Sequence, residues 1–146
     1  MTRVSVQTGP FDPGSEAEAL ERLGAGAIAT FTGLVRNDDG VDALTLEHYP
    51  GMTEAALEAL LAEAEARWSL AGARIVHRVG RLDIGARIVF VGTASAHRKD
   101  ALEACAFLID RLKTDAPFWK KEDRAGAESW VAARETDEDA AARWED

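Results

Sequence analysis

Two lysines on either side of a proline are the residues of this chain best suited to acid–base chemistry. Lys113 stands at the end of an apolar helical repeat, and Lys120 follows the break that Pro117 imposes. A reversal around the proline would bring the two amines together. Neighbouring lysines lower one another's pKa, and a neutral lysine can act as a general base or a nucleophile. Spacing alone favours a simpler interpretation, with Lys113 complementing the helix end and Lys120 in a solvated turn.

A second candidate pair, His97 and Arg98, follows an apolar strand and opens the next helix. Free backbone N–H groups and the helix dipole favour anions at such an end. Two basic side chains there are electrostatically mismatched with the dipole unless an anion is bound. From the residues alone, two interpretations stay open: an anion-binding site, or two basic side chains that lie in the first helical turn without binding a ligand.

Other kinds of site lack their sequence signals. The three histidines are far apart, with no HxxxH or CxxC companion, so we discard a structural zinc site. No Walker loop, dinucleotide fingerprint or GxSxG elbow is present. The single cysteine, Cys105, falls on an apolar helical stripe and is interpreted as a buried core thiol. We therefore expect no metal and no cofactor.

Composition narrows the class of protein further. The 146 residues fit one domain, residues 1–146, and the net charge of -9 disfavours nucleic-acid binding. No apolar run is long enough to span a bilayer and no secretion signal opens the chain, so we expect a cytoplasmic protein that binds no membrane. The tail from about residue 135 to 146 is acidic. Basic residues instead gather between His97 and Arg124, a pattern that an anionic ligand would explain, although a solvated mixed-charge face is the commoner cause.

Hydrophobic periodicity predicts alternating strands and helices. Strands are expected at 4–7, 27–35, 43–49, 74–79, 86–93, 118–121 and 129–133. Helices are expected at about 15–23 with an Asp12 or Ser15 cap, from a Thr53 cap to Trp68, and from a Ser95 cap to the Pro117 break, with a frayed helix at the end. The Asp39-Gly40 turn predicts a hairpin between strands 27–35 and 43–49, and 81–85 reads as a turn. This order indicates an α+β fold with helices packed on a mainly antiparallel sheet.

Several long blocks, in order along the chain, resemble one known family. They include Leu44–Met52 (LTLEHYPGM), Ser95–Arg98 (SAHR) and Leu112–Lys121 (LKTDAPFWKK). From about Gly26 to Arg134 the chain resembles the large subunit of molybdopterin synthase, the MoaE family. The resemblance implies an α/β hammerhead fold with an additional antiparallel β subdomain, assembled as a homodimer.

The resemblance also implies the reaction and the partner. Each protomer would bind a small ubiquitin-like sulfur-carrier subunit of the MoaD type, giving a heterotetramer with two carriers. The C-terminal Gly-Gly thiocarboxylate of the carrier would enter a pocket of the large subunit. Sulfur would pass from it to cyclic pyranopterin monophosphate, forming the dithiolene of molybdopterin. The chain would then be a sulfurtransferase in molybdenum cofactor biosynthesis.

The resemblance assigns roles residue by residue. It gives the essential lysine role to Lys113, with Lys120 as its catalytic neighbour. Leu34 stands where many members have a basic residue, so only its backbone is expected to contact substrate. The implied substrate-binding set is Leu34, Val35, Arg36, His97, Arg98, Lys113, Lys120, Lys121 and Glu122, with Arg134 near the pocket of the other protomer. The alternatives are a non-catalytic anion-binding or regulatory α+β module, and a large subunit that only binds its partner.

Overall fold

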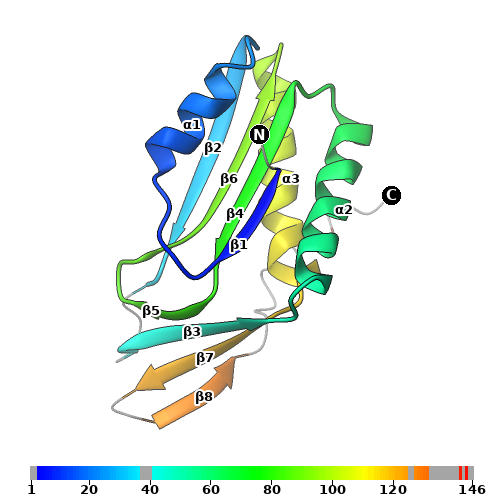
Figure 1. Cartoon of the computed structure of the whole chain (residues 1–146). Helices are drawn as coiled ribbons and strands as arrows, with labels where there is room; N and C mark the ends of the chain where they lie inside the picture. The colour runs from blue at the N-terminus through cyan, green and yellow to red at the C-terminus, as the bar shows by residue number, and fades with distance from the viewer. Residues whose placement is uncertain (1–2, 37–40, 125–126, 132–141, 143, 145–146) are drawn as a thin grey trace.

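The structure is a computed structural model, and it describes residues 3–36, 41–124, 127–131, 142 and 144. Its elements are β1 (Val4–Gln7), α1 (Pro13–Glu21), β2 (Ala27–Leu34), β3 (Ala43–His48), α2 (Met52–Arg67), β4 (Gly72–Arg78), β5 (Gly80–Asp83), β6 (Arg87–Ser95), α3 (Arg98–Asp115), β7 (Phe118–Arg124) and β8 (Ala127–Val131). The strands form two four-stranded sheets, ordered β1-β4-β6-β2 and β5-β3-β7-β8. Figure 1 shows the second sheet lying across the lower end of the first.

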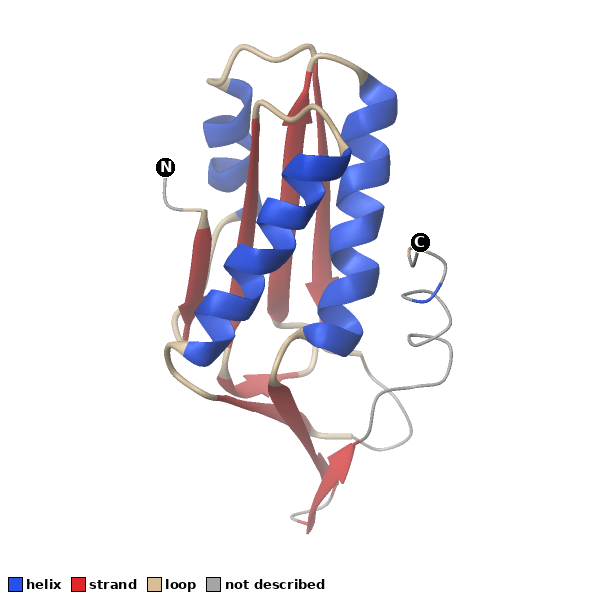
Figure 2. Cartoon of the chain, turned by 90° about the vertical axis from the view of Figure 1, so that its right-hand side faces the viewer, coloured by secondary structure: helices blue, strands red, loops and turns tan. Residues whose placement is uncertain are grey.

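The first sheet is covered by helices on both faces. Figure 2 shows α2 and α3 side by side on one face, with α1 behind the sheet. Strand β6 alternates accordingly: Val89 and Val91 pack with α2 and α3, whereas Phe90 and Ala94 pack with Leu20 of α1. Burying apolar side chains on both faces is the main source of stability for such a layer.

The second sheet has a smaller core. Leu44 and Leu46 of β3 pack with Leu82 of β5 and with Val35, which follows β2. All four side chains are buried. This cluster joins the second sheet to the end of β2, and thereby fixes the sheet beneath the helical layer.

The predicted α+β class is confirmed, and each described helix and every described strand except β5 falls close to a predicted one. The predicted hairpin between strands 27–35 and 43–49 is wrong. Strand β2 pairs antiparallel with β6 in the first sheet, whereas β3 pairs with β5 and β7 in the second. The turn chemistry at Asp39-Gly40, which lies outside the described residues, is a local signal. Pairing was decided instead by burial, because β2 lies between α1 and α3 and β3 packs on Leu82.

Three smaller predictions are also wrong. Residues 81–83 form part of strand β5 rather than a turn. Thr53 does not cap α2, because Gly51 holds that position with φ of 85° and Glu54 accepts a hydrogen bond from its N–H at 2.9 Å. Ser95 does not cap α3, because its hydroxyl donates to the carbonyl of Ser69 and the cap position is His97.

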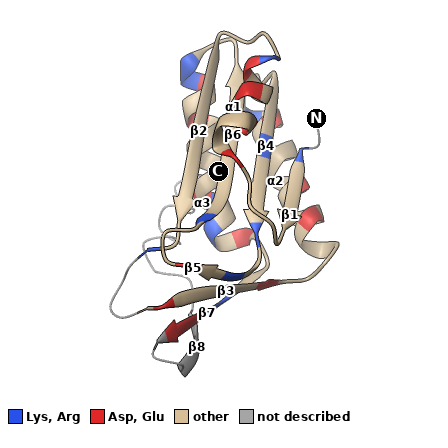
Figure 3. Cartoon of the chain, turned by 60° about the vertical axis from the view of Figure 1, so that its left-hand side comes forward, with Lys and Arg blue, Asp and Glu red and all other residues tan. Residues whose placement is uncertain are grey.

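Charges are spread over both sheets rather than gathered on one face, as the interspersed basic and acidic segments of Figure 3 show. Within the part of the chain that the structure describes, no helix is long and apolar enough to cross a membrane. The basic stretch of the sequence is divided by α3, which places its first members at one end of the helix and Lys113 at the other.

Candidate active site

The helix break before Pro117 puts Lys113 and Lys120 on two elements that meet at the junction of the sheets. Lys113 lies in the last turn of α3, and Lys120 is the third residue of β7. Helix α3 ends at Asp115 because Ala116, the residue before proline, is extended (φ -77°, ψ 133°). Both lysine side chains are exposed. The predicted end of the helix before Pro117 is therefore confirmed.

His77 lies on the first sheet, next to the start of β7. It is the penultimate residue of β4, only 6% exposed, and its ring stacks on Phe118 with centroids 3.9 Å apart and planes at 19°. The pKa of His77 is lowered to about 4, mainly by burial and to a smaller extent by the positive charges of Lys113, Lys120 and His48. The imidazole is therefore neutral at physiological pH. The charges of both lysines and of His48 thus act on the same ring.

The tautomer of His77 follows from its hydrogen bond. Nδ1 lies 2.8 Å from the carbonyl oxygen of Arg78. A carbonyl can only accept, so Nδ1 carries the proton and Nε2 is left as an acceptor nitrogen. The site thus holds a neutral ring with one unprotonated nitrogen beside two lysines.

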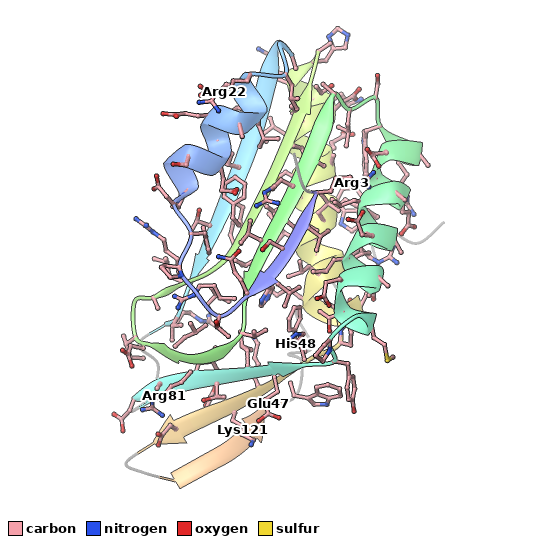
Figure 4. All side chains as sticks on the ribbon, in the orientation of Figure 1. Arg3, Arg22, Glu47, His48, Arg81 and Lys121 are labelled. Carbon is pink, nitrogen blue, oxygen red and sulfur yellow. The ribbon has the colours of Figure 1, made fainter. Side chains whose placement is uncertain are left out.

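Strand β7 directs its side chains alternately to two faces. Lys120 pairs in register with Leu46, which is buried, so Lys120 starts from the face of the second sheet that meets the first. Lys121 starts from the other face and binds Glu47 at 3.2 Å. Figure 4 shows Glu47 and Lys121 together on that outer side. Glu122 is half-buried on the same face as Lys120 and pairs with Leu44.

Leu34, Val35 and Arg36 lie where β2 reaches the second sheet. The side chain of Leu34 is 54% exposed, and Arg36 is exposed as well. Val35 is buried in the small core, its N–H donates to the carbonyl of Ala86 at 2.9 Å, and its carbonyl accepts from Gly85. Contacts of this segment with a ligand would therefore come from Leu34 and Arg36 more readily than from Val35.

His97 and Arg98 are exposed at the opposite end of α3 from Lys113. Fifteen residues of helix place Arg98 and Lys113 about 22 Å apart along the axis. A single copy of the chain therefore does not bring these two groups into one site. Arg134 lies outside the described residues.

Sequence patterns did not identify His77 and His48 as parts of this site. His77 follows Ile75 and Val76 in an apolar strand, and a lone histidine there is most often a satisfied core residue. The one sequence signal that could have identified His77 was a polar ring at the end of an otherwise apolar strand.

Cys105 is confirmed as a core thiol: it is 5% exposed, and burial raises its pKa to about 11. A thiol with that pKa is a poor nucleophile.

The arrangement can bind anions and manage protons. Two exposed ammonium groups can hold a phosphate or a carboxylate by charge-assisted hydrogen bonds. They can also stabilise an oxyanion that forms during acyl or phosphoryl chemistry. Among the described residues, no cluster of three or more histidine, cysteine or acidic side chains could hold a metal ion.

Comparison with known proteins decides the family. Residues 6–115 match the family described as MoaE protein. The chain belongs to the MoaE family. A curated MoaE-family relative, the molybdopterin synthase catalytic subunit of Pseudomonas aeruginosa, is 53% identical over 98% of this chain and 99% of its own length.

Solved structures agree with this MoaE assignment. Molybdopterin cofactor biosynthesis protein E from Burkholderia multivorans is 52% identical, with a TM-score of 0.84 over 99% of this chain and 97% of its own. Molybdopterin synthase from Staphylococcus aureus is 32% identical, with a TM-score of 0.84 over 90% of this chain and 98% of its own. The MoaE match includes Lys113, whereas Lys120 and Arg134 follow it and are covered by the longer alignments.

Proposed function

We propose that this chain is the catalytic subunit of a molybdopterin synthase, a sulfurtransferase of molybdenum cofactor biosynthesis. It would transfer sulfur from a thiocarboxylated carrier subunit to cyclic pyranopterin monophosphate. The proposal is supported by the MoaE membership and by the names of relatives that match nearly the full chain. The structural observation that carries it is that exposed Lys113, at the end of α3, and exposed Lys120, in β7, lie on two elements that meet at the Pro117 break.

In this proposal the two lysines have different duties. Lys113 projects from the rigid end of α3 and either moves protons or transiently takes the acyl end of the carrier. Lys120 stabilises the oxyanion that develops as sulfur attacks and the phosphate ester opens. Cys105 supplies no sulfur, because it is buried and its raised pKa keeps it a thiol. Two sulfurs are needed for a dithiolene, so two charged carriers are consumed for each product.

The pocket of the proposed enzyme is shared between two protomers. Arg36, Lys113 and Lys120 of one copy would meet His97, Arg98 and Arg134 of another. The support is that His97 and Arg98 lie too far from Lys113 within one chain, although their charges suit the same phosphate. Two carriers would bind the homodimer and give a heterotetramer, and the protein is expected in the cytoplasm.

The function is tested by mixing the purified protein with a thiocarboxylated carrier and the cyclic pterin, and measuring dithiolene product. We expect product from the native protein and none from the uncharged carrier. A native protein that binds the carrier and pterin but forms no product would overturn the proposal in favour of a non-catalytic anion-binding module.

The shared pocket is tested by complementation. Lys113→Ala and Arg98→Ala dimers should each be inactive, since both of their pockets lack one group. Mixed dimers have one intact pocket, so after random exchange the mixture should recover about one quarter of native activity. If all the groups came from one chain, the mixture would stay as inactive as the separate variants.

A further inference from the structure

The separation between Lys113 and Lys120 depends on a short corner of the chain. Lys113 belongs to α3, which packs against β2 and β6 of the first sheet, whereas Lys120 belongs to β7 of the second. Only the segment around Pro117 joins them covalently. Contacts that hold this corner therefore determine where one amine stands relative to the other.

Three contacts hold the corner from elements distant in sequence. The buried hydroxyl of Thr53 in α2 donates to the carbonyl of Pro117 at 3.4 Å and accepts from the N–H of Tyr49 at 3.2 Å. Phe118 pairs with His48 across the β3–β7 ladder. On the side of the first sheet, the ring of His77 stacks on that of Phe118.

The His77 contact joins the two sheets and has a fixed orientation. The hydrogen bond from Nδ1 to the carbonyl of Arg78 restricts rotation of the ring about its own bond, and so sets the plane on which Phe118 lies. Phe118 is the first residue of β7, two residues before Lys120. A ring that shifted would move the start of the strand and, with it, the lysine.

We propose that His77 is a positioning residue, whose imidazole stacks on Phe118 and thereby sets the place of Lys120 relative to Lys113. It rests on the proposed function, since the lysines must be the reacting groups for their spacing to affect a rate. His77 itself touches no reacting atom in this scheme. Its neutral form also allows two ammonium groups nearby, because an imidazolium would add a third positive charge.

Two substitutions separate the ring from the hydrogen bond. His77→Asn keeps a donor near the carbonyl of Arg78 but removes the stacking surface, whereas His77→Phe keeps an aromatic ring and loses the donor. Ile75→Ala is the matched control, because Ile75 is fully buried on the same strand and packs in the helical core. All rates are compared well below the melting temperature of each variant.

We expect the rate of dithiolene formation at saturating carrier and pterin to fall on the order of 10- to 100-fold in His77→Asn, as for a misplaced catalytic group. KM for the pterin should change little, His77→Phe should keep most of the rate, and Ile75→Ala should keep all of it. Phe118→Leu should lose as much as His77→Asn, and the double variant should be no worse than either single one. A native rate in His77→Asn, an equal loss in Ile75→Ala, or losses that multiply in the double variant would overturn the proposal.

A second measurement does not depend on turnover. NMR signals of the lysine side-chain ε-CH₂ groups in the resting protein should shift for Lys120 in His77→Asn and stay in place for Lys99, which is exposed at the far end of α3. Unchanged Lys120 signals would overturn the positioning role even if the rate fell. If the native protein formed no product, the proposed function would fail, and these signals would still decide whether His77 positions Lys120.

Discussion

The two sheets of this molecule differ in what covers them. The first sheet is buried on both faces, with Phe90 toward α1 and Val91 toward α2 and α3. The second buries one small cluster and carries ion pairs elsewhere, such as Lys121 with Glu47 and Arg81 with Asp123. Figure 4 shows Glu47, Lys121 and Arg81 away from the helical layer.

This difference indicates how the site is built. Lys113 extends from the well-packed helical layer, whereas Lys120 belongs to the more polar sheet. A well-packed layer gives one amine a fixed place, and the polar sheet presents the other to solvent and ligands. The boundary between the helical layer and the polar sheet, where His77 stacks on Phe118, lies between the fixed amine and the amine that is presented to ligands.

Among the substitutions that compare the two sheet regions, the largest effect is expected at Lys120 of β7. Lys120→Ala should lower product formation on the order of 100-fold, because it removes the group that stabilises the oxyanion. Lys121→Ala should cost much less, because its side chain leaves the other face and pairs with Glu47. Product yield at fixed carrier and pterin measures both, with thermal melting as the folding control. Equal losses in the two variants would show that product formation does not depend on which face of β7 a lysine extends from.

The contrast in packing is tested by a buried Leu→Ala substitution in the core of each of the two sheets. Leu61→Ala, in the helical core, and Leu82→Ala, in the small cluster, remove side chains that are 0% and 1% exposed. Buried Leu→Ala changes cost about 2–5 kcal/mol, and we expect Leu61 near the top of that range and Leu82 near the bottom. The tighter helical core can collapse less around a cavity. Urea unfolding measures the difference, and a larger cost at Leu82 would reverse the comparison.

Acid should destabilise the boundary through His77. Burial lowers its pKa from the ordinary 6.5 to about 4. Between these two pH values the imidazole is therefore protonated in the unfolded chain and neutral in the folded chain. Stability is therefore lost as pH falls from 6.5 toward 4. Between pH 7 and pH 5 the loss from this group is about 2 kcal/mol.

His77→Phe provides the control for this pH dependence, because it retains His48 and His97. The free energy of unfolding in urea should fall less between pH 7 and pH 5 in the variant than in the native protein. Parallel pH profiles for the two proteins would show that His77 is not the titrating group.

The smallest effect is expected at Cys105, within the helical layer. Cys105→Ala should cost about 1 kcal/mol of stability, as expected for a small cavity. Product formation should stay at the native level, because the sulfur comes from the carrier. A well-folded variant without activity would contradict the assignment of Cys105 to the core.

The helices and the break before Pro117 could be predicted because their signals are local. The stripe that includes Cys105 and Leu108 fixed the buried face of α3, and Pro117 fixed its end. The lysines could be named because they lie on either side of that end. Local rules were sufficient wherever the deciding contacts were close in sequence.

The sheet partners and His77 could not be predicted because their deciding contacts are distant in sequence. The Asp39-Gly40 turn suggested a hairpin, but β2 pairs with β6 in the first sheet and β3 pairs with β5 and β7 in the second. Thr53 resembled a helix cap, yet its hydroxyl was needed at Pro117. Nothing in the order Ile75, Val76, His77 reveals that Phe118 will lie against the imidazole.

The central claim is that Lys113 takes part in the chemistry rather than only binding an anion. Lys113→Arg tests it most directly, because guanidinium keeps the positive charge but stays protonated and cannot serve as a base or acyl acceptor. Dithiolene formation is measured with saturating charged carrier and pterin, with carrier binding and thermal melting as controls. The account predicts a folded variant that binds the carrier and forms no product. Normal turnover by Lys113→Arg would contradict it and reassign Lys113 to anion binding.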